Sequence, residues 1–496
     1  MKETCAVHQD HPASMTMASS TLEQVDDLCS CSHADITRVL LVNKSLTEAG
    51  IPVQLWSLTS LTHLSLTGNM LATIPADLKQ LTALTSLNLS HNRITEVPEF
   101  ISKLQALQDL DLGRNSLYYL PSAIGSLPAL QYLNVMNNSL AAVPPQVGKL
   151  SALYRLGLKG NQLKSLPESV AGLKGLVELF VTNNCLVRLP DGMSGLTSLV
   201  KLQASFNALT SLPAGMGHLP RLELMRVAVN AIEQVPTEFG GLTALAWFSL
   251  AGNPACPAAP PIRSDILPLA LDQLELATAL GDGASGDVFA AKFQGRDVAV
   301  KIFKAEASPD GHAQDEIAVT CFVNHPNLIK VIGIIEHPHA LVLERVWGRP
   351  LALKPNFKSL LRCRWAAGQT FTLQFVLNVT TCVAAALAYL HAHNICHGDV
   401  YAHNVLADDT GGSVLCDYGA SFFYQPCGVP YEAQEVRAFG LLLRDLILRI
   451  RRQEVDDRPD QDSYAVLQHV LSLCTDSNTV ATQRPTFSRL CATLKK

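Results

Sequence analysis

The sequence has few of the features that mark secreted, membrane-bound or nucleic-acid-binding proteins. Its formal net charge is only -5 over 496 residues and its pI is near 6.3, so we expect neither nucleic acid nor an anionic membrane surface as a partner. We find no run of about 18 uncharged apolar residues that would span a membrane, and no apolar signal-peptide core near the start. The thirteen cysteines are unevenly spaced, which favours a reducing compartment. We therefore expect a cytoplasmic protein.

The first residues of the chain are polar and show no hydrophobic period. Cys29, Cys31 and His33 lie close together and could suggest zinc, but their spacing is shorter than that of the usual zinc ligand pairs. A disordered tail over residues 1–35 explains this composition more simply.

A repeat of 23 residues organises the first half of the chain. From the repeating leucine to the repeating asparagine, one unit reads LTALTSLNLSHN, from Leu81 to Asn92. Eight of the nine units close with a proline. This is the period of a leucine-rich repeat. The repeating leucines are Leu58, Leu81, Leu104, Leu127, Leu150, Leu173, Leu196, Leu219 and Leu242, and the repeating asparagines are Asn69, Asn92, Asn115, Asn138, Asn161, Asn184, Asn207, Asn230 and Asn253.

One repeat cannot bury its own apolar face, so the coils are expected to stack and to share a continuous leucine core. The stretch around Leu64, Ser65 and Leu66 predicts the short strand of each coil, and the asparagine after it is expected to satisfy main-chain groups of the bend. Both positions are therefore structural. The array is predicted over residues 36–253, with nine repeats from about residue 58 and a degenerate N-terminal cap before them.

The outward strand positions predict the residues of the concave face. They change from acidic, with Asp109 and Asp111, to a mixture of basic and aromatic side chains, which is typical of a protein-binding surface. The alternative is a solvated face with scattered large side chains. The candidate partner-binding residues are Tyr132, Arg155, Lys159, Phe180, Lys201, Arg226 and Trp247.

Prolines and alanines over residues 254–267 predict a stiff connector, and a second domain is expected over residues 268–496. That domain opens with a glycine-rich turn, GDGASG, between two strand-like segments. Glycines in this pattern also open dinucleotide-binding folds, where a helix follows them. Here two further strand-like segments follow, the last containing Val298 to Lys301, and this order favours a phosphate-binding loop between strands.

Residues 268–496 resemble a protein kinase domain, with a small lobe over 268–346 and a large lobe over 347–496. The strongest stretch is HGDVYAHN, which contains Asp399 and Asn404 five residues apart, followed by the CDYG sequence around Asp417. The resemblance implies that Asp399 accepts the proton of the substrate hydroxyl. Asn404 and Asp417 would hold Mg²⁺, and Lys301, supported by Glu316, would hold the phosphates of ATP.

The same resemblance implies a nucleotide-binding set drawn from the glycine loop, the small-lobe strands and the hinge, with Leu343 as the gatekeeper. The expected residues are Gly281, Asp282, Gly283, Ala284, Ser285, Gly286, Val288, Ala299, Lys301, Leu343, Glu344, Val346 and Asn404.

Three departures from the kinase pattern affect regulation and substrate binding. Gly398 replaces the arginine that in many kinases reads a phosphorylated activation loop, so a phospho-switch through that residue is not expected. The segment after Asp417 is short and has no APE motif. The surface that binds a peptide substrate at the end of this segment in other kinases must therefore be smaller or formed by other residues. Arg484 resembles the arginine that pairs with the APE glutamate, and Glu432 is a candidate substitute for that glutamate.

We therefore expect an α/β leucine-rich-repeat solenoid followed by a bilobal α+β protein kinase-like domain. The chain resembles soluble leucine-rich-repeat protein kinases, which implies transfer of phosphate from ATP to protein serine or threonine with Mg²⁺. The short activation segment favours an alternative, a pseudokinase scaffold that binds proteins through the repeats.

Overall fold

The fold is described from a computed structural model, which covers residues 20–24, 36–283, 285–305, 307–308, 311–426, 428–451, 461–476 and 481–495. Of the tail expected to be disordered, residues 20–24 fall within these ranges, and Ser20–Leu22 (β1) pairs in parallel with Ile36–Leu40 (β2). The other residues of that tail, including Cys29, Cys31 and His33, lie outside the described residues, as does Ala284 of the glycine loop.

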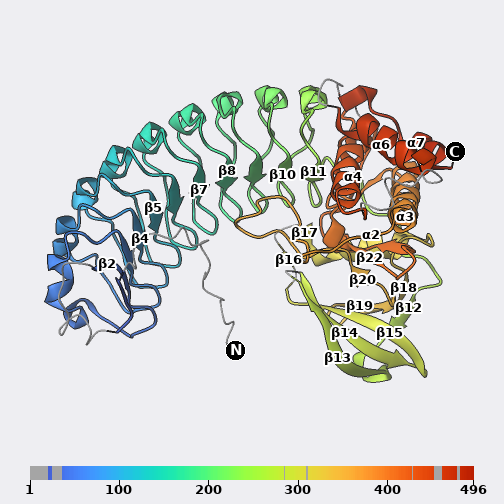
Figure 1. The fold of residues 1–496 in the computed structure, drawn as a ribbon, viewed down its shortest axis with the longest axis horizontal. Coiled ribbons are helices and arrows are strands. Elements are labelled where there is room, and N and C mark those ends of the chain that lie inside the picture. The colour runs from blue at the N-terminus through green and yellow to red at the C-terminus, as the bar shows by residue number, and fades with distance from the viewer. Residues whose placement is uncertain are drawn as a thin grey trace.

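The repeats form an arch with one parallel strand per coil on its inner side and one short 3-10 helix per coil on its outer side (Figure 1). The eleven strands pair in chain order. After β1 and β2 they are β3 (His63–Ser65), β4 (Ser86–Asn88), β5 (Asp109–Asp111), β6 (Tyr132–Asn134), β7 (Arg155–Gly157), β8 (Glu178–Phe180), β9 (Lys201–Gln203), β10 (Leu224–Arg226) and β11 (Trp247–Ser249). The strands β3 to β11 keep the step of 23 residues that the sequence predicts.

The 3-10 helices follow the prolines of the repeat, which occupy their N-cap positions from η4 onward. They are η2 (Glu48–Gly50), η3 (Val53–Ser57), η4 (Ala76–Gln80), η5 (Glu99–Lys103), η6 (Ser122–Ser126), η7 (Pro145–Lys149), η8 (Glu168–Gly172), η9 (Asp191–Gly195), η10 (Ala214–His218) and η11 (Thr237–Gly241).

The predicted role of the repeat asparagines is confirmed. The Asn92 side chain accepts a hydrogen bond from the main-chain nitrogen of Leu71 at 3.0 Å, and its amide donates to the carbonyls of Leu66 and Leu89 at 2.9 and 3.0 Å. Each asparagine thereby ties its own coil to its neighbours, since main-chain groups buried in a bend need a partner.

The small lobe of the second domain is a six-stranded sheet in the order β12-β18-β19-β15-β14-β13, with helix α2 packed beside it. Its elements are β12 (Leu267–Leu269), η12 (Leu271–Gln273), β13 (Leu274–Asp282), β14 (Gly286–Phe293), β15 (Arg296–Phe303), β16 (Ala307–Ser308), β17 (Gly311–His312), α2 (Ala313–Phe322), β18 (Val331–Ile335) and β19 (Ala340–Glu344). The tight turn between β13 and β14 carries the glycine loop.

The large lobe is mainly helical and contains the C-terminus (Figure 1). Its elements are β20 (Arg349–Pro350), α3 (Leu373–Ala392), β21 (Ile395–Cys396), η13 (Ala402–Asn404), β22 (Val405–Ala407), β23 (Ser413–Leu415), β24 (Phe422–Phe423), α4 (Tyr431–Ile447), α6 (Gln461–Thr475), η15 (Ala481–Gln483) and α7 (Phe487–Leu494). Thr372 caps α3, because its hydroxyl accepts a hydrogen bond from the main-chain nitrogen of Phe375 at 3.1 Å.

Helix α3 is, among the described helices, the one that is long and apolar enough to cross a membrane, with a mean hydropathy of 1.7. The expectation that the sequence holds no such stretch is therefore wrong by length and composition. Half of this stretch is buried inside the protein, where α3 packs against α4, α6 and α7. A helix in the centre of a lobe is apolar for that reason, so α3 is accounted for as a core helix.

The two domains share their hydrophobic cores. The core of the array continues into Cys396, Phe422 and Tyr431 of the large lobe. The core of the large lobe takes in Leu224 and Trp247 from the last two strands of the array. The array and the second domain are thus packed directly on each other, in addition to their covalent connection.

Candidate active site

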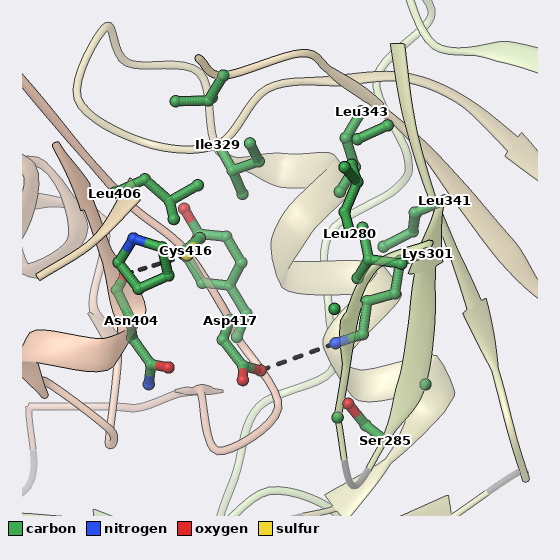
Figure 2. A pocket seen from close by; sticks show the side chains of 18 of the residues that line it. Leu280, Ser285, Lys301, Ile329, Leu341, Leu343, Asn404, Leu406, Cys416 and Asp417 are labelled. Carbon is green, nitrogen blue, oxygen red and sulfur yellow. Dashed lines mark hydrogen bonds and ion pairs between the residues drawn. The ribbon is translucent and has the colours of Figure 1, made fainter. Parts of the chain in front are cut away.

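A cavity of about 470 Å³ lies between the small and the large lobe. Its walls include every described residue of the predicted nucleotide-binding set, from Gly281 in the glycine loop to Asn404 in the large lobe. Figure 2 shows Lys301, Asn404 and Asp417 around one hollow, with Leu341 and Leu343 on the small-lobe side. The cavity is therefore lined by residues of both lobes.

Lys301 connects the two lobes. It comes from β15, forms an ion pair with Glu316 of α2, and has its amine 3.7 Å from an Asp417 carboxylate oxygen. Burial opposes the charged form, but the nearby carboxylates of Asp417 and Glu316 outweigh it and raise the Lys301 pKa, so the amine remains charged. The predicted lysine, helix glutamate and aspartate are thus brought together.

Asp417 sits at the floor of the cavity with a positive φ of 69°, which turns its carboxylate towards Lys301. Burial would raise its pKa, but the positive charges of Lys301 and Lys354 lower it below the ordinary value. Asp417 is therefore ionised at neutral pH. The next residue, Tyr418, is buried and its ring lies 5.4 Å from that of His397, so it packs inside the large lobe.

The loop that carries Asp399 is held from behind by a buried carboxylate. Glu435 in α4 accepts hydrogen bonds from the main-chain nitrogens of Gly398 and His397 at 2.7 and 3.2 Å, and it contacts His391 of α3 at 2.8 Å. In front, the Asn404 amide donates to Asp399 Oδ2 at 2.8 Å. The positions of Asp399 and Asn404 are therefore fixed relative to each other.

Comparison with known proteins agrees with this geometry. A family model described as "Protein kinase domain" matches residues 274–436, and three leucine-rich-repeat models match residues 59–102, 82–140 and 118–208. The chain is a leucine-rich-repeat array followed by a protein kinase domain. The resemblance stated from the motifs and the predicted fold class are both confirmed.

Several of its curated relatives are named as kinases, with 23% to 32% identity to this chain. The chain is 23% identical over 255 residues to "Probable serine/threonine-protein kinase kinY" of Dictyostelium discoideum, a match that covers 42% of each chain. It is 28% identical over 167 residues to "Serine/threonine-protein kinase TNNI3K" of Mus musculus, covering 32% of this chain and 19% of that protein. It is 32% identical over 155 residues to the "Megakaryocyte-associated tyrosine-protein kinase" of Rattus norvegicus, covering 30% and 31%. The chain thus spans 42% or less of each of these relatives.

Two solved structures share partial similarity with the chain. The "Plant peptide hormone receptor RGFR1 in complex with RGF2" is 29% identical with a TM-score of 0.37, and the match covers 44% of this chain and 39% of that one. A leucine-rich-repeat protein of Leptospira interrogans is 24% identical with a TM-score of 0.29, covering 48% and 83%.

The repeat array contacts the loop of the kinase domain that carries Asp399. Arg226, the last residue of β10, places a guanidinium nitrogen 2.7 Å from Asp399 Oδ1. Trp247 of β11 stacks on Tyr401 and donates its indole N–H to the carbonyl of Val400 at 3.1 Å. Three residues of the loop are therefore in contact with the last two strands of the array.

Other concave positions hold the segment that precedes α3. The ring of Phe357 contacts Tyr132 edge-on, and the Arg155 guanidinium lies 3.4 Å from the centre of the Phe357 ring. Arg362 pairs with Glu223 at 2.7 Å. Four of the seven residues predicted to bind a separate partner, Tyr132, Arg155, Arg226 and Trp247, thus contact the protein's own kinase domain. Lys201 and Phe180 contact each other, with the amine 5.2 Å from the ring centre, and Lys159 is half-buried.

The short activation segment is completed by the array. It runs from Asp417 through β24, which pairs with β21, and α4 begins at Tyr431. Arg437 of α4 then donates to the carbonyl of Ala244 at 2.9 Å, and the Phe248 ring packs against Phe422 and Tyr431. The last coil of the array therefore packs directly on the short segment and on the start of α4.

The predicted pairing of Arg484 with Glu432 is wrong. Arg484 donates to the carbonyls of Ala433 and Thr243 at 3.1 and 2.6 Å, whereas Glu432 accepts from the main-chain nitrogen of Phe487. Within the described ranges no carboxylate pairs with Arg484, and burial with the nearby Arg437 lowers its pKa to about 10. Two carbonyls, one of them from the array, replace the expected acid.

Three residues that motif reasoning missed also belong to the site. Lys354 and His403 line the cavity, and Glu435 holds the loop of Asp399. Lys354 lies in an irregular segment after the hinge, where no spacing rule applies. Glu435 gave no clear signal either, because other polar residues, Glu432, Gln434 and Arg437, surround it at the start of α4.

No group of three or more His, Cys, Asp or Glu residues suited to holding a metal occurs in the described part of the chain. Asp417 and Asn404 instead offer one carboxylate and one amide oxygen at the same end of the cavity (Figure 2). This hard, oxygen-only pair suits Mg²⁺, which in nucleotide sites takes one or two protein ligands and shares the phosphates.

Proposed function

We propose that the protein is a kinase that transfers the γ-phosphate of ATP, with Mg²⁺, to a serine or threonine hydroxyl of a protein. The observation that supports this most is the convergence of Lys301, Glu316 and Asp417 in a cavity that also borders the glycine loop and Asn404. A cavity of about 470 Å³ falls in the ordinary range for nucleotide-sized ligands.

The side chains have separate tasks in this reaction. Lys301 would hold the α- and β-phosphates, and the main-chain N–H groups of the glycine loop would face the β- and γ-phosphates. Asp417 and Asn404 would hold the Mg²⁺, which neutralises charge on the phosphates when bound. The adenine would lie between Val288, Ala299 and the hinge at Glu344 to Val346, all of which line the cavity.

Asp399 would orient the acceptor hydroxyl and take its proton. The hydroxyl oxygen forms a bond to the γ-phosphorus while the bond from that phosphorus to the bridging oxygen of ADP breaks. The chain contributes position and charge, which is where most of the catalysis of phosphoryl transfer arises.

The direct test uses purified full-length protein, labelled ATP, Mg²⁺ and a generic protein acceptor. We expect label on the acceptor or on the protein itself, at serine or threonine when the site is mapped by mass spectrometry. Asp417→Asn should lower the rate by about 10³-fold or more, because it removes a metal ligand. Transfer at the wild-type rate in this variant would refute the assignment of Asp417, and label on tyrosine alone would refute the serine/threonine assignment.

The short activation segment favours a second candidate, a pseudokinase scaffold that binds proteins without phosphotransfer. Thermal unfolding with and without ATP and Mg²⁺ separates the two when combined with the transfer assay. Ligand at 100 times its Kd adds about 2.7 kcal/mol to stability. A shift without any transfer would support the scaffold, and transfer would exclude it.

The repeats are proposed to recruit a protein partner or substrate, and the protein is proposed to act in the cytoplasm. The concave positions at Lys159, Phe180 and Lys201 are half-buried and offer basic and aromatic side chains, which favours a protein with an acidic segment. Crosslinking of the wild-type chain and of a Lys159→Glu variant in cell extract tests this. Loss of crosslinked protein in the variant is expected, and identical products would contradict it.

A further inference from the structure

The ion pair between Arg226 and Asp399 places a residue of the repeat array inside the catalytic centre. We infer that Arg226 is a positioning residue for phosphotransfer, so the array completes the active site of the kinase domain. This inference rests on the proposed function. Arg226 Nη2 lies 2.7 Å from Asp399 Oδ1, and both side chains are largely shielded, with 11% and 14% of their surfaces exposed. A shielded pair is weakly screened by solvent and salt, so the contact holds the carboxylate firmly.

The carboxylate of Asp399 is oriented from two sides. Arg226 donates to Oδ1, and the Asn404 amide donates to Oδ2 at 2.8 Å. Each carboxylate oxygen has two acceptor positions, so these two bonds leave room for the hydroxyl of a substrate. The side chain of Asp399 also keeps some exposure. The two hydrogen bonds therefore orient the Asp399 carboxylate and leave it accessible to a substrate hydroxyl.

The catalytic loop has no cation of its own to replace Arg226. The residues from His397 to Asn404 include neither lysine nor arginine. Position 398 cannot supply one, because a Cβ at Gly398 would lie 2.7 Å from the carbonyl oxygen of Phe248 in the array and 2.6 Å from that of Ala420. The array thus fills the space beside the loop and also supplies the positive charge.

The position of Arg226 is fixed before any substrate arrives. Its strand, β10, is paired on both sides with β9 and β11. The neighbouring strand β11 holds the catalytic loop through Trp247, and Glu223, just before β10, pairs with Arg362 of the large lobe. A base that needs no rearrangement at the moment of reaction acts most effectively, and these contacts hold Arg226, and through it Asp399, in place beforehand.

The test compares Arg226→Met, Arg226→Lys and, as a matched control, Arg221→Met, which removes an exposed arginine from the same repeat. All are made in the full-length chain, and kcat and the KM for ATP are measured with Mg²⁺ and a generic protein acceptor. We expect Arg226→Met to lower kcat by about 10²-fold with the KM for ATP within about twofold of wild type. Arg226→Lys should recover part of the rate, since it keeps the charge but loses the fork geometry. Arg221→Met should match wild type.

Each other outcome decides against the inference. An unchanged kcat in Arg226→Met would show that the ion pair has no part in transfer, and a higher kcat would show that Arg226 restrains the enzyme. Should Arg226→Met fail to fold, Arg226→Lys carries the test, and a wild-type rate there would overturn the inference. If wild type and Arg221→Met transfer no phosphate, the proposed function itself has failed, which is a different result from an active wild type with an equally active Arg226→Met.

Discussion

The indole ring of Trp247 lies flat on the phenol ring of Tyr401, with ring centres 4.4 Å apart and an angle of 4° between the planes. One ring belongs to the last strand of the repeat array and the other to the loop that carries Asp399, and both are almost fully buried. The stack, together with the hydrogen bond from the indole to the carbonyl of Val400, fastens the loop to the array.

Trp247→Ala is therefore expected to destabilise the protein by about 3–5 kcal/mol, the usual cost of removing a large buried aromatic side chain. Trp247→Phe should cost less, because it keeps a stacked ring and loses mainly the hydrogen bond, about 1 kcal/mol. Chemical denaturation of both variants measures this. Tyr118→Ala, which removes an array tyrosine that is 62% exposed, is the control and should change stability little. A Trp247→Ala cost as small as that of the control would contradict the importance of the stack.

Gly398→Ala should be strongly destabilising, by about 2–4 kcal/mol, for two reasons. Gly398 has a φ of 75°, which side chains adopt poorly, and a Cβ would meet two carbonyl oxygens, those of Ala420 and of Phe248. The midpoint of thermal unfolding reports the loss. Gly172→Ala is the matched control, since a Cβ there meets nothing within 4 Å and the backbone is not left-handed, so its midpoint should stay near that of wild type.

Lys354→Met should weaken the binding of ATP and Mg²⁺ by about tenfold, as expected for the loss of one charge that faces phosphates. The Lys354 amine lies near the glycine loop at Gly283, and its charge helps to lower the pKa of Asp417. Titration calorimetry or the thermal shift with nucleotide measures the affinity. Lys149→Met removes an exposed lysine from the outer side of the array and should leave affinity unchanged. Equal affinities in the two variants would remove Lys354 from the site.

Glu435 predicts a dependence of stability on pH. Its burial would raise its pKa, but hydrogen bonds and charge from His391, with a further contribution from His397 and the N–H of Gly398, lower the pKa below the ordinary 4.5. A carboxyl with a depressed folded-state pKa stabilises the fold at pH values above 4.5, and that contribution is lost as pH falls through the lower folded-state pKa.

We expect Glu435→Gln to cost about 3 kcal/mol at pH 7 and progressively less as the pH falls below about 4.5. Unfolding midpoints of wild type and variant between neutral and acid pH measure the difference. A constant difference over the whole range would show that the charge of Glu435 contributes nothing to stability.

Much of the fold follows from spacing alone. Leucines and asparagines at a step of 23 residues predict the strands from β3 to β11, because each coil must place the same side chains in one continuous core. The resemblance to protein kinases predicts that Lys301, Glu316, Asn404 and Asp417 meet, and all four line one cavity, because each has a defined place on a strand, helix or loop of that fold.

The contact between the domains could not be predicted in this way. Arg226 and Asp399 are 173 residues apart, and no period or motif relates two positions at that distance. The error at Arg484 has a similar origin, because a sequence shows carboxylates but does not show which main-chain carbonyls a fold leaves free to accept hydrogen bonds. The place of Lys354 in the cavity could not be predicted, because it lies in an irregular segment where residue spacing does not indicate a position in the fold.

The hydrogen bond from Arg484 to the carbonyl of Thr243 has a consequence for engineering. In a chimera that joins this kinase domain to a different solenoid, the buried guanidinium of Arg484 would lose this acceptor, unless the new solenoid placed a carbonyl at the same position. The two halves are therefore not interchangeable parts. They are expected to melt in a single cooperative step, and a designer who wishes to give the protein a new partner should alter the early coils and leave the final two intact.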